Sequence, residues 1–129
     1  MAASTAFVKR EISSHTHSAN QITSGTMTGP ITVNGEFIAT GNITAFSDKR
    51  LKTNIRKVDS ALARVRGLHG VTFNRIDRDN IRQVGLIAQD VKQVLPEAVR
   101  EVDGILTVDY MGIIGLLVEA IKELETNNA

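Results

Sequence analysis

The chain has 129 residues, of which 42% are hydrophobic and only 4% are aromatic, and its formal net charge is +1. It contains no cysteine, which excludes disulfides, thiolate metal sites and a cysteine nucleophile. No stretch is long and apolar enough to cross a membrane, since the richest run, residues 111–118, is eight residues long. We expect one small domain with an extension, and a modest core that association with other chains would supplement.

The net charge of the whole chain is small because two oppositely charged parts nearly cancel. Residues 49–82 carry ten Lys and Arg against three Asp, a balance of +7, and residues 83–129 carry three against eight Asp and Glu, a balance of −5. One interpretation is a basic patch for a nucleotide or nucleic acid. The other is that the two parts pack on each other, within a chain or between chains. We favour packing, because no pattern of interleaved aromatic residues accompanies the basic run.

Residues 1–24 are a polar lead-in that is rich in Ser, Thr and His. On an extended strand, His15 and His17 would share one face. In a threefold fibre, three such pairs would place six imidazoles around the axis, an arrangement suited to a transition metal. The alternative is a pair of solvated histidines without a ligand.

Residues 25–46 contain a short repeat. Gly29, Gly35 and Gly41 each open a six-residue unit with a large apolar residue at the third position, followed by β-favouring residues. Each glycine permits a turn, and the residues after it favour a short strand. Three copies cannot bury a core alone, but three chains wound around one axis could do so, as in a fibre shaft. The alternative is a simple meander with a hairpin turn at Asn34-Gly35.

Residues 47–129 form the compact part, for which the residue pattern predicts a small domain of mixed helices and strands. The whole chain is therefore predicted to be α+β, with a short β-strand stalk in residues 1–46 and a small domain that ends in a long amphipathic helix. The predicted elements are a helix at 58–68 stopped by Gly70, a strand at 71–76, a polar turn at 77–80, a buried strand at 84–88, a helix at 89–95 ended by Pro96, a hairpin of 98–101 and 105–108 around Asp103-Gly104, and a helix at 109–125 capped by Asp109.

The last helix carries a heptad seam, with apolar residues spaced alternately four and three apart: Tyr110, Ile114, Leu117, Ile121 and Leu124. Further apolar residues at Met111, Ile113 and Val118 widen the apolar face beyond one seam. A wide face fits a helix that packs on its own domain and also on a partner chain, whereas burial within one chain is the simpler alternative.

Ser47 and Lys52 lie where the glycine repeat meets the charged, helix-forming part, a placement that suggests a chain that cuts itself. A serine hydroxyl is a weak nucleophile that needs a base, and a lysine serves only when its amine is neutral. Side chains five residues apart face opposite ways on a straight strand and lie off one face of a helix. The pair therefore needs a turn at residues 48–50 or a lysine from another subunit. The alternative is that Ser47-Asp48 is only a turn or an N-cap.

The remaining polar candidates are Gln89, Asp90, Glu97 and Asp109, and Gln89 is the one with a possible supporting role. If it is buried, its amide could donate to an oxyanion, or it could be a structural amide whose hydrogen bonds are satisfied. The chain has no P-loop, GxGxxG or HExxH motif, so kinase, Rossmann and zincin functions have no support.

Three ordered motifs in residues 47–129 resemble the C-terminal intramolecular chaperone domain of endosialidases and of phage tail spikes, fibres and neck appendages, which is also a self-cleaving peptidase family. They are the opening SDKRLKTNI (residues 47–55), the central VGLIAQDV (84–91) with VLPE (94–97), and the ending LTVDY (106–110) with LLVEAIKEL (116–124).

The resemblance implies a homotrimer that helps the upstream β-structure of the same chain to fold and is then released by autoproteolysis between Phe46 and Ser47. Ser47 matches the family's serine and Lys52 its lysine, and the resemblance therefore implies a single-turnover Ser-Lys peptidase with no required cofactor. Phe46 is bulkier than the small residue expected before the cut. The implied setting is synthesis in the host cytoplasm, with the upstream part in the virion. Two alternatives stay open: a trimeric cap that does not cleave, and a nucleotide- or nucleic-acid-binding module at residues 49–82.

Overall fold

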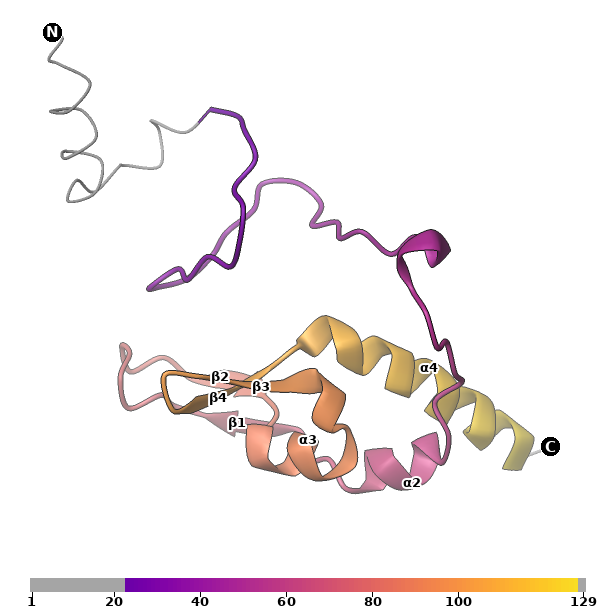
Figure 1. The fold of residues 1–129 in the computed structure, drawn as a ribbon. Coiled ribbons are helices and arrows are strands. Elements are labelled where there is room, and N and C mark those ends of the chain that lie inside the picture. The colour runs from indigo at the N-terminus through magenta and orange to yellow at the C-terminus, as the bar shows by residue number, and fades with distance from the viewer. Residues whose placement is uncertain (1–22, 128–129) are drawn as a thin grey trace, which may run out of the picture. The chain divides into compact units, whose positions relative to one another are not determined.

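The computed structural model of the chain describes residues 23–127. The chain groups into two units, residues 1–46 and residues 47–129, with the boundary between Phe46 and Ser47 (Figure 1). Within the described residues, no helix combines the length and the apolar character needed to span a bilayer.

The glycine repeat of the first unit forms bends but no strands. The backbone bends at Gly29, at residues 34–35 and at residues 40–41, which keeps the predicted six-residue spacing. The positive φ of Gly29 (+99°) and of Gly35 (+143°) lies in a region open mainly to glycine. The predicted strands, and the alternative hairpin, are wrong for the described part of this single chain, because a strand needs a neighbouring backbone to pair with. The apolar side chains between the bends are exposed.

The second unit begins with a short 3-10 helix, η2 (Lys49–Leu51), and an irregular segment that leads to α2 (Ala61–Arg66) (Figure 1). Helix α2 is shorter than the predicted 58–68, and it ends at Gly67 rather than at Gly70. It begins late because Ser60 is left-handed, with φ of +50°, and makes no side-chain cap. The carboxylate of Glu123 caps α2 instead, accepting the backbone N–H groups of Ala61 at 3.3 Å and Leu62 at 2.5 Å.

Two antiparallel hairpins and a second helix follow α2. Strands β1 (Val71–Phe73) and β2 (Gln83–Gly85) form the first hairpin, and both are shorter than predicted. Helix α3 (Ala88–Val94) leads to the 3-10 turn η3 (Pro96–Ala98), which Pro96 starts, as its missing N–H allows.

The second hairpin confirms the predicted turn. Strands β3 (Val99–Val102) and β4 (Ile105–Val108) pair with Val102 opposite Ile105. Asp103 and Gly104 both have positive φ, +52° and +80°, as a tight two-residue turn between twisted strands requires.

Helix α4 (Tyr110–Asn127) is the last described element, and it packs against α2 (Figure 1). Its first turn is capped as predicted, since the Asp109 carboxylate accepts the N–H of Gly112 at 3.2 Å. The core of the unit is small and lies between α2, α3, η3 and α4. Its buried members are Ala61, Val91, Leu95, Ala98, Ile113, Leu116 and Ala120.

Candidate functional site

The turn that the Ser47–Lys52 pair requires is present as η2. Backbone hydrogen bonds from Leu51 N to Asp48 O (3.0 Å) and from Lys52 N to Lys49 O (3.1 Å) close one tight turn of chain. Lys52 returns to the side on which Ser47 lies, and its Nζ donates to Ser47 Oγ at 2.6 Å. The structure therefore brings the hydroxyl and the amine into hydrogen-bond contact within one chain. Their catalytic roles stay a prediction.

Asp48 is the N-cap of this turn, and Arg50 clamps its carboxylate. Asp48 Oδ1 accepts the backbone N–H of Arg50 at 2.8 Å, and the guanidinium donates to the same carboxylate through Nε at 3.1 Å and Nη2 at 2.8 Å. These bonds hold the pKa of Asp48 below its ordinary value, chiefly through the Arg50 side chain. The support that the ionised carboxylate gives to the turn is thus present above the unfolded-state pKa and lost as pH falls through the lower folded-state pKa.

The pair lies on an exposed arm, which we define as residues 47–57. All side chains of the arm are exposed, including Leu51 at 68% and Ile55 at 63%. Phe46, on the other side of the predicted cut, is 94% exposed. The arm meets the body of its unit at Lys57, whose Nζ lies 3.5 Å from Glu119 Oε1. A single chain therefore aligns the two groups but does not exclude water from them.

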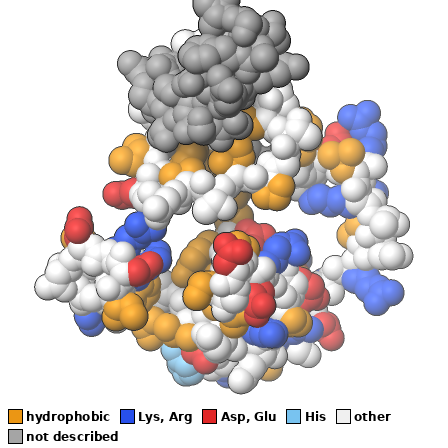
Figure 2. Space-filling view, turned by 60° about the vertical axis from the view of Figure 1, so that its left-hand side comes forward, with side chains coloured by type: hydrophobic (Ala, Val, Ile, Leu, Met, Phe, Trp, Pro, Cys, Tyr) orange, Lys and Arg blue, Asp and Glu red, His pale blue; other side chains and the backbone are white. Residues whose placement is uncertain are grey.

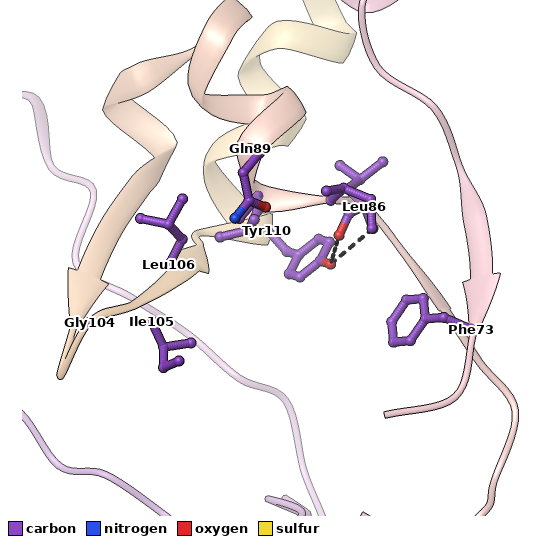
Figure 3. A pocket seen from close by; sticks show the side chains of 10 residues that line it. Phe73, Leu86, Gln89, Gly104, Ile105, Leu106 and Tyr110 are labelled. Carbon is purple, nitrogen blue, oxygen red and sulfur yellow. Dashed lines mark hydrogen bonds between the residues drawn. The ribbon is translucent and has the colours of Figure 1, made fainter. Parts of the chain in front are cut away.

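Gln89 lies in a different place from the Ser47–Lys52 pair. The condition of burial is not met, because the Gln89 side chain is exposed in the first turn of α3. It lines a pocket of about 430 Å³ bordered by both hairpins and the start of α4 (Figure 3). The described residues show no hydrogen bond between Gln89 and either Ser47 or Lys52.

Tyr110 connects two walls of the pocket by hydrogen bonds, a role that the heptad pattern does not reveal. Its hydroxyl accepts the backbone N–H of Leu86 at 3.1 Å and lies 3.5 Å from Leu86 O, so it joins the end of β2 to the start of α4 (Figure 3). Apolar side chains form most of the remaining wall: Phe73, Ile87, Ile105, Leu106 and Val108.

The predicted metal ligands His15 and His17 lie outside the described residues, so a transition metal on them stays a prediction. Among residues 23–127 no group of three or more His, Cys, Asp or Glu side chains is arranged to hold a metal ion.

The basic part of the chain is partly neutralised by ion pairs. Arg50, Lys57, Arg64 and Arg75 each lie within 4.0 Å of a carboxylate, and the partners are Asp48, Glu119, Asp59 and Asp77. The Lys57–Glu119 pair joins the basic and acidic parts directly, and the Arg64 guanidinium donates to Val94 O at 3.2 Å across the same boundary. These contacts favour packing of the two parts on each other over an open surface for nucleic acid.

Comparison with known proteins adds a family to this geometry. The model of a peptidase family described as chaperone of endosialidase matches residues 47–100. The long tail fiber protein Gp37 of Enterobacteria phage K3 is 40% identical over 105 residues, which is 70% of this chain and 8% of that protein. Gp37 of Enterobacteria phage M1 is 39% identical over 105 residues, which is 42% of its length. The chain thus spans less than half of these relatives. Residues 47–100 thus match the chaperone-of-endosialidase family, and the tail fibre relatives support a chaperone domain of phage tail fibres in this part of the chain.

Proposed function

We propose that residues 47–129 are a trimerising intramolecular chaperone of a phage tail spike, fibre or appendage, which releases itself by cutting between Phe46 and Ser47. The observation that carries the cleavage is the 2.6 Å hydrogen bond from Lys52 Nζ to Ser47 Oγ. The division of the chain between Phe46 and Ser47 adds support, since the bond to be cut joins two separate units. Release at that point would leave the upstream fold kinetically trapped, because its aligning element would be gone.

The chemistry follows from the two side chains. Neutral Lys52 takes the proton of the Ser47 hydroxyl, and Oγ attacks the carbonyl carbon of Phe46. The C–N bond between Phe46 and Ser47 breaks, the proton passes to the departing amine of Ser47, and an ester joins Phe46 to Ser47 Oγ. Water then hydrolyses the ester, which leaves a carboxylate on Phe46 and restores the hydroxyl of Ser47.

A trimer supplies what the single chain lacks. The lysine must be neutral to act as a base, and burial favours a neutral amine, yet the arm is exposed in one chain. The arm also presents Leu51 and Ile55 to solvent, and α4 presents its whole heptad seam. Neighbouring chains that cover these apolar side chains would remove water from Ser47 and Lys52 as well.

The upstream repeat fits the role of the folding client. Residues 25–46 place bends at six-residue intervals and expose their apolar side chains, as a shaft strand does before its partner chains join it. The relatives are named as long tail fibre proteins, and we propose a virion-bound fibre as the setting of this chain.

The experiment that tests this function is intact mass spectrometry of the freshly made chain beside Ser47→Ala and Lys52→Arg. We expect the wild type to split between Phe46 and Ser47. We expect both variants to cleave at least about a hundredfold more slowly, because one lacks the nucleophile and the other keeps a cation that cannot accept a proton. Ser60→Ala and Lys92→Arg are the matched controls, since both positions are exposed and lie outside the arm.

A Ser47→Ala chain that cuts as fast as the wild type would rule out this mechanism. Chains that all stay whole but trimerise would identify the domain as a structural cap that does not cleave. Binding of the trimer to nucleic acid at low salt, weakened steeply by added salt, would instead support the module at residues 49–82.

A further inference from the structure

Asp48 and Arg50 are residues of the arm that lie, in the sequence, between the proposed nucleophile and its base. Three hydrogen bonds from Arg50 converge on the Asp48 carboxylate, one from the backbone and two from the guanidinium. The backbone bond closes the N-terminus of η2, and the two side-chain bonds fix the carboxylate in the capping position. No part of the core supports this turn, because residues 47–57 are all exposed. The turn is therefore held by its own hydrogen bonds.

The same pair also sets the local charge around Lys52. The charged residues that share the exposed arm with Lys52 are Asp48, Lys49, Arg50, Arg56 and Lys57. Asp48 is the one acid among them, and an unpaired carboxylate on the same turn would favour the protonated form of the amine. The Asp48 carboxylate forms a salt bridge with the Arg50 guanidinium at 2.8 Å, and this cation compensates the negative charge of Asp48.

We propose that Asp48 and Arg50 are positioning residues for the self-cleavage, with two separable tasks. Asp48 holds the turn that carries Lys52 back to Ser47, and Arg50 compensates the Asp48 charge so that Lys52 can be neutral. This inference rests on the proposed function, since it concerns the reaction between Ser47 and Phe46.

The two tasks predict different effects of three substitutions. Asp48→Ala removes the cap, and we expect cleavage to slow about five- to tenfold, which is the fold-change that loss of an N-cap produces in the population of its turn. Asp48→Asn keeps an oxygen for the N–H of Arg50 but leaves the guanidinium unpaired. Arg50→Ala leaves the carboxylate unpaired.

The charge effects have opposite signs, which a merely structural role would not produce. The cleavage rate should rise with pH as the base loses its proton. An unpaired Arg50 cation in Asp48→Asn favours the neutral amine of Lys52. The rising limb of the curve of cleavage rate against pH should therefore move to lower pH. An unpaired Asp48 anion in Arg50→Ala favours the ammonium, so the limb should move to higher pH, each by about half a pH unit or more.

The test follows the cleavage of freshly translated full-length chain after dilution into buffers of about pH 6 to 10, with the products resolved by intact mass. The matched controls are Asp77→Asn and Arg75→Ala, because Arg75 clamps Asp77 two residues away in the same bidentate manner on an exposed loop. Both controls should cleave at the wild-type rate with unmoved pH limbs.

The outcomes separate this inference from the proposed function. Opposite shifts of the pH limb, with slow cleavage in Asp48→Ala, would support the positioning roles. A wild type that cleaves while Asp48→Ala keeps the full rate, or limbs that move in one direction or stay in place, would overturn the inference and leave the proposed function intact. A wild type that stays whole would overturn both.

Discussion

At the scale of single residues, the site depends on how a tight turn changes the direction of side chains. Ser47 and Lys52 are five residues apart, a separation that points them away from each other on a strand. Three residues of 3-10 helix shorten the path between them and reverse that direction, and Nζ meets Oγ at 2.6 Å. The cap at Asp48, which alone would indicate an ordinary turn, is thus part of the same arrangement as the candidate dyad.

The hydrogen bond between Tyr110 and Leu86 depends on the absence of a side chain at Gly85. A Cβ at Gly85 would lie 2.7 Å from the Tyr110 hydroxyl, which is bonded to the backbone of Leu86 and cannot move without losing that bond. We expect Gly85→Ala to lower the free energy of unfolding by about 1 to 3 kcal/mol, the usual cost of overpacking. Chemical denaturation checks this expectation. Gly70→Ala is the control, because a Cβ there meets nothing within 4 Å, and equal effects of the two changes would contradict the prediction.

At the scale of elements, helix α4 has one buried apolar stripe and one exposed apolar stripe. One face is buried against α2, α3 and η3 through Ile113, Leu116 and Ala120, which are 6%, 1% and 5% exposed. The other face carries the heptad seam, whose members range from 42% to 64% exposed in the single chain. The wide apolar face predicted from the sequence is thus divided into a stripe that packs on its own domain and a stripe that stays uncovered.

Glu123 extends the buried face of α4 and fixes where α2 begins. Its carboxylate replaces the missing side-chain cap of Ser60 by accepting two N–H groups at the first turn of α2. We expect Glu123→Ala to destabilise the domain by about 1 to 2 kcal/mol, because an N-cap is lost and two backbone donors are left partly buried. Glu125→Ala is the control on the exposed side of the same helix. Thermal unfolding that gives equal midpoints for the two variants would contradict the prediction.

At the scale of the whole molecule, one chain does not cover its own apolar surface. The described residues bury seven hydrophobic side chains in the core, whereas exposed isoleucines, valines, methionines and aromatic residues occur in both units. Figure 2 shows such hydrophobic side chains open on the surface among the charged ones. A small core combined with large uncovered apolar surface is typical of a chain that completes its packing by association.

The assembly prediction follows from the uncovered stripe of α4. Ile114 and Ile121 are 57% and 64% exposed on the seam, and we expect Ile114→Lys combined with Ile121→Lys to convert a trimer into monomers. Light scattering coupled to gel filtration measures the change. Ile76→Lys is the control, because Ile76 is fully exposed on the β1–β2 loop, away from the seam. A double variant that stays trimeric would place the interface elsewhere.

Loss of the trimer should also affect cleavage if neighbouring chains exclude water from the arm. We expect the monomeric variant to cleave at least about tenfold more slowly than the wild type, because no neighbouring chain would exclude water from Ser47 and Lys52. Intact mass at matched times checks this. Undiminished cleavage in the monomer would show that a single chain suffices for the reaction.

The sequence alone determined the elements whose signals are local. The Asp103-Gly104 turn, the α3 helix that ends before Pro96, and the cap of α4 at Asp109 each depend on residues that are neighbours in the chain, and the structure confirms them. The family-specific motifs at residues 47–55 and 84–97 were readable for the same reason.

Tertiary structure alone decided the features that depend on distant partners. Helix α2 begins at Ala61 because Glu123, 62 positions away, caps it, and no pattern in residues 58–68 reveals that carboxylate. Gln89 is exposed because α3 turns its first residues toward the Tyr110 pocket rather than the core. The repeat at residues 25–46 forms bends without strands, because a β ladder needs a second backbone that one chain does not supply. Local residues fix the turns and caps, and only packing fixes which faces are covered.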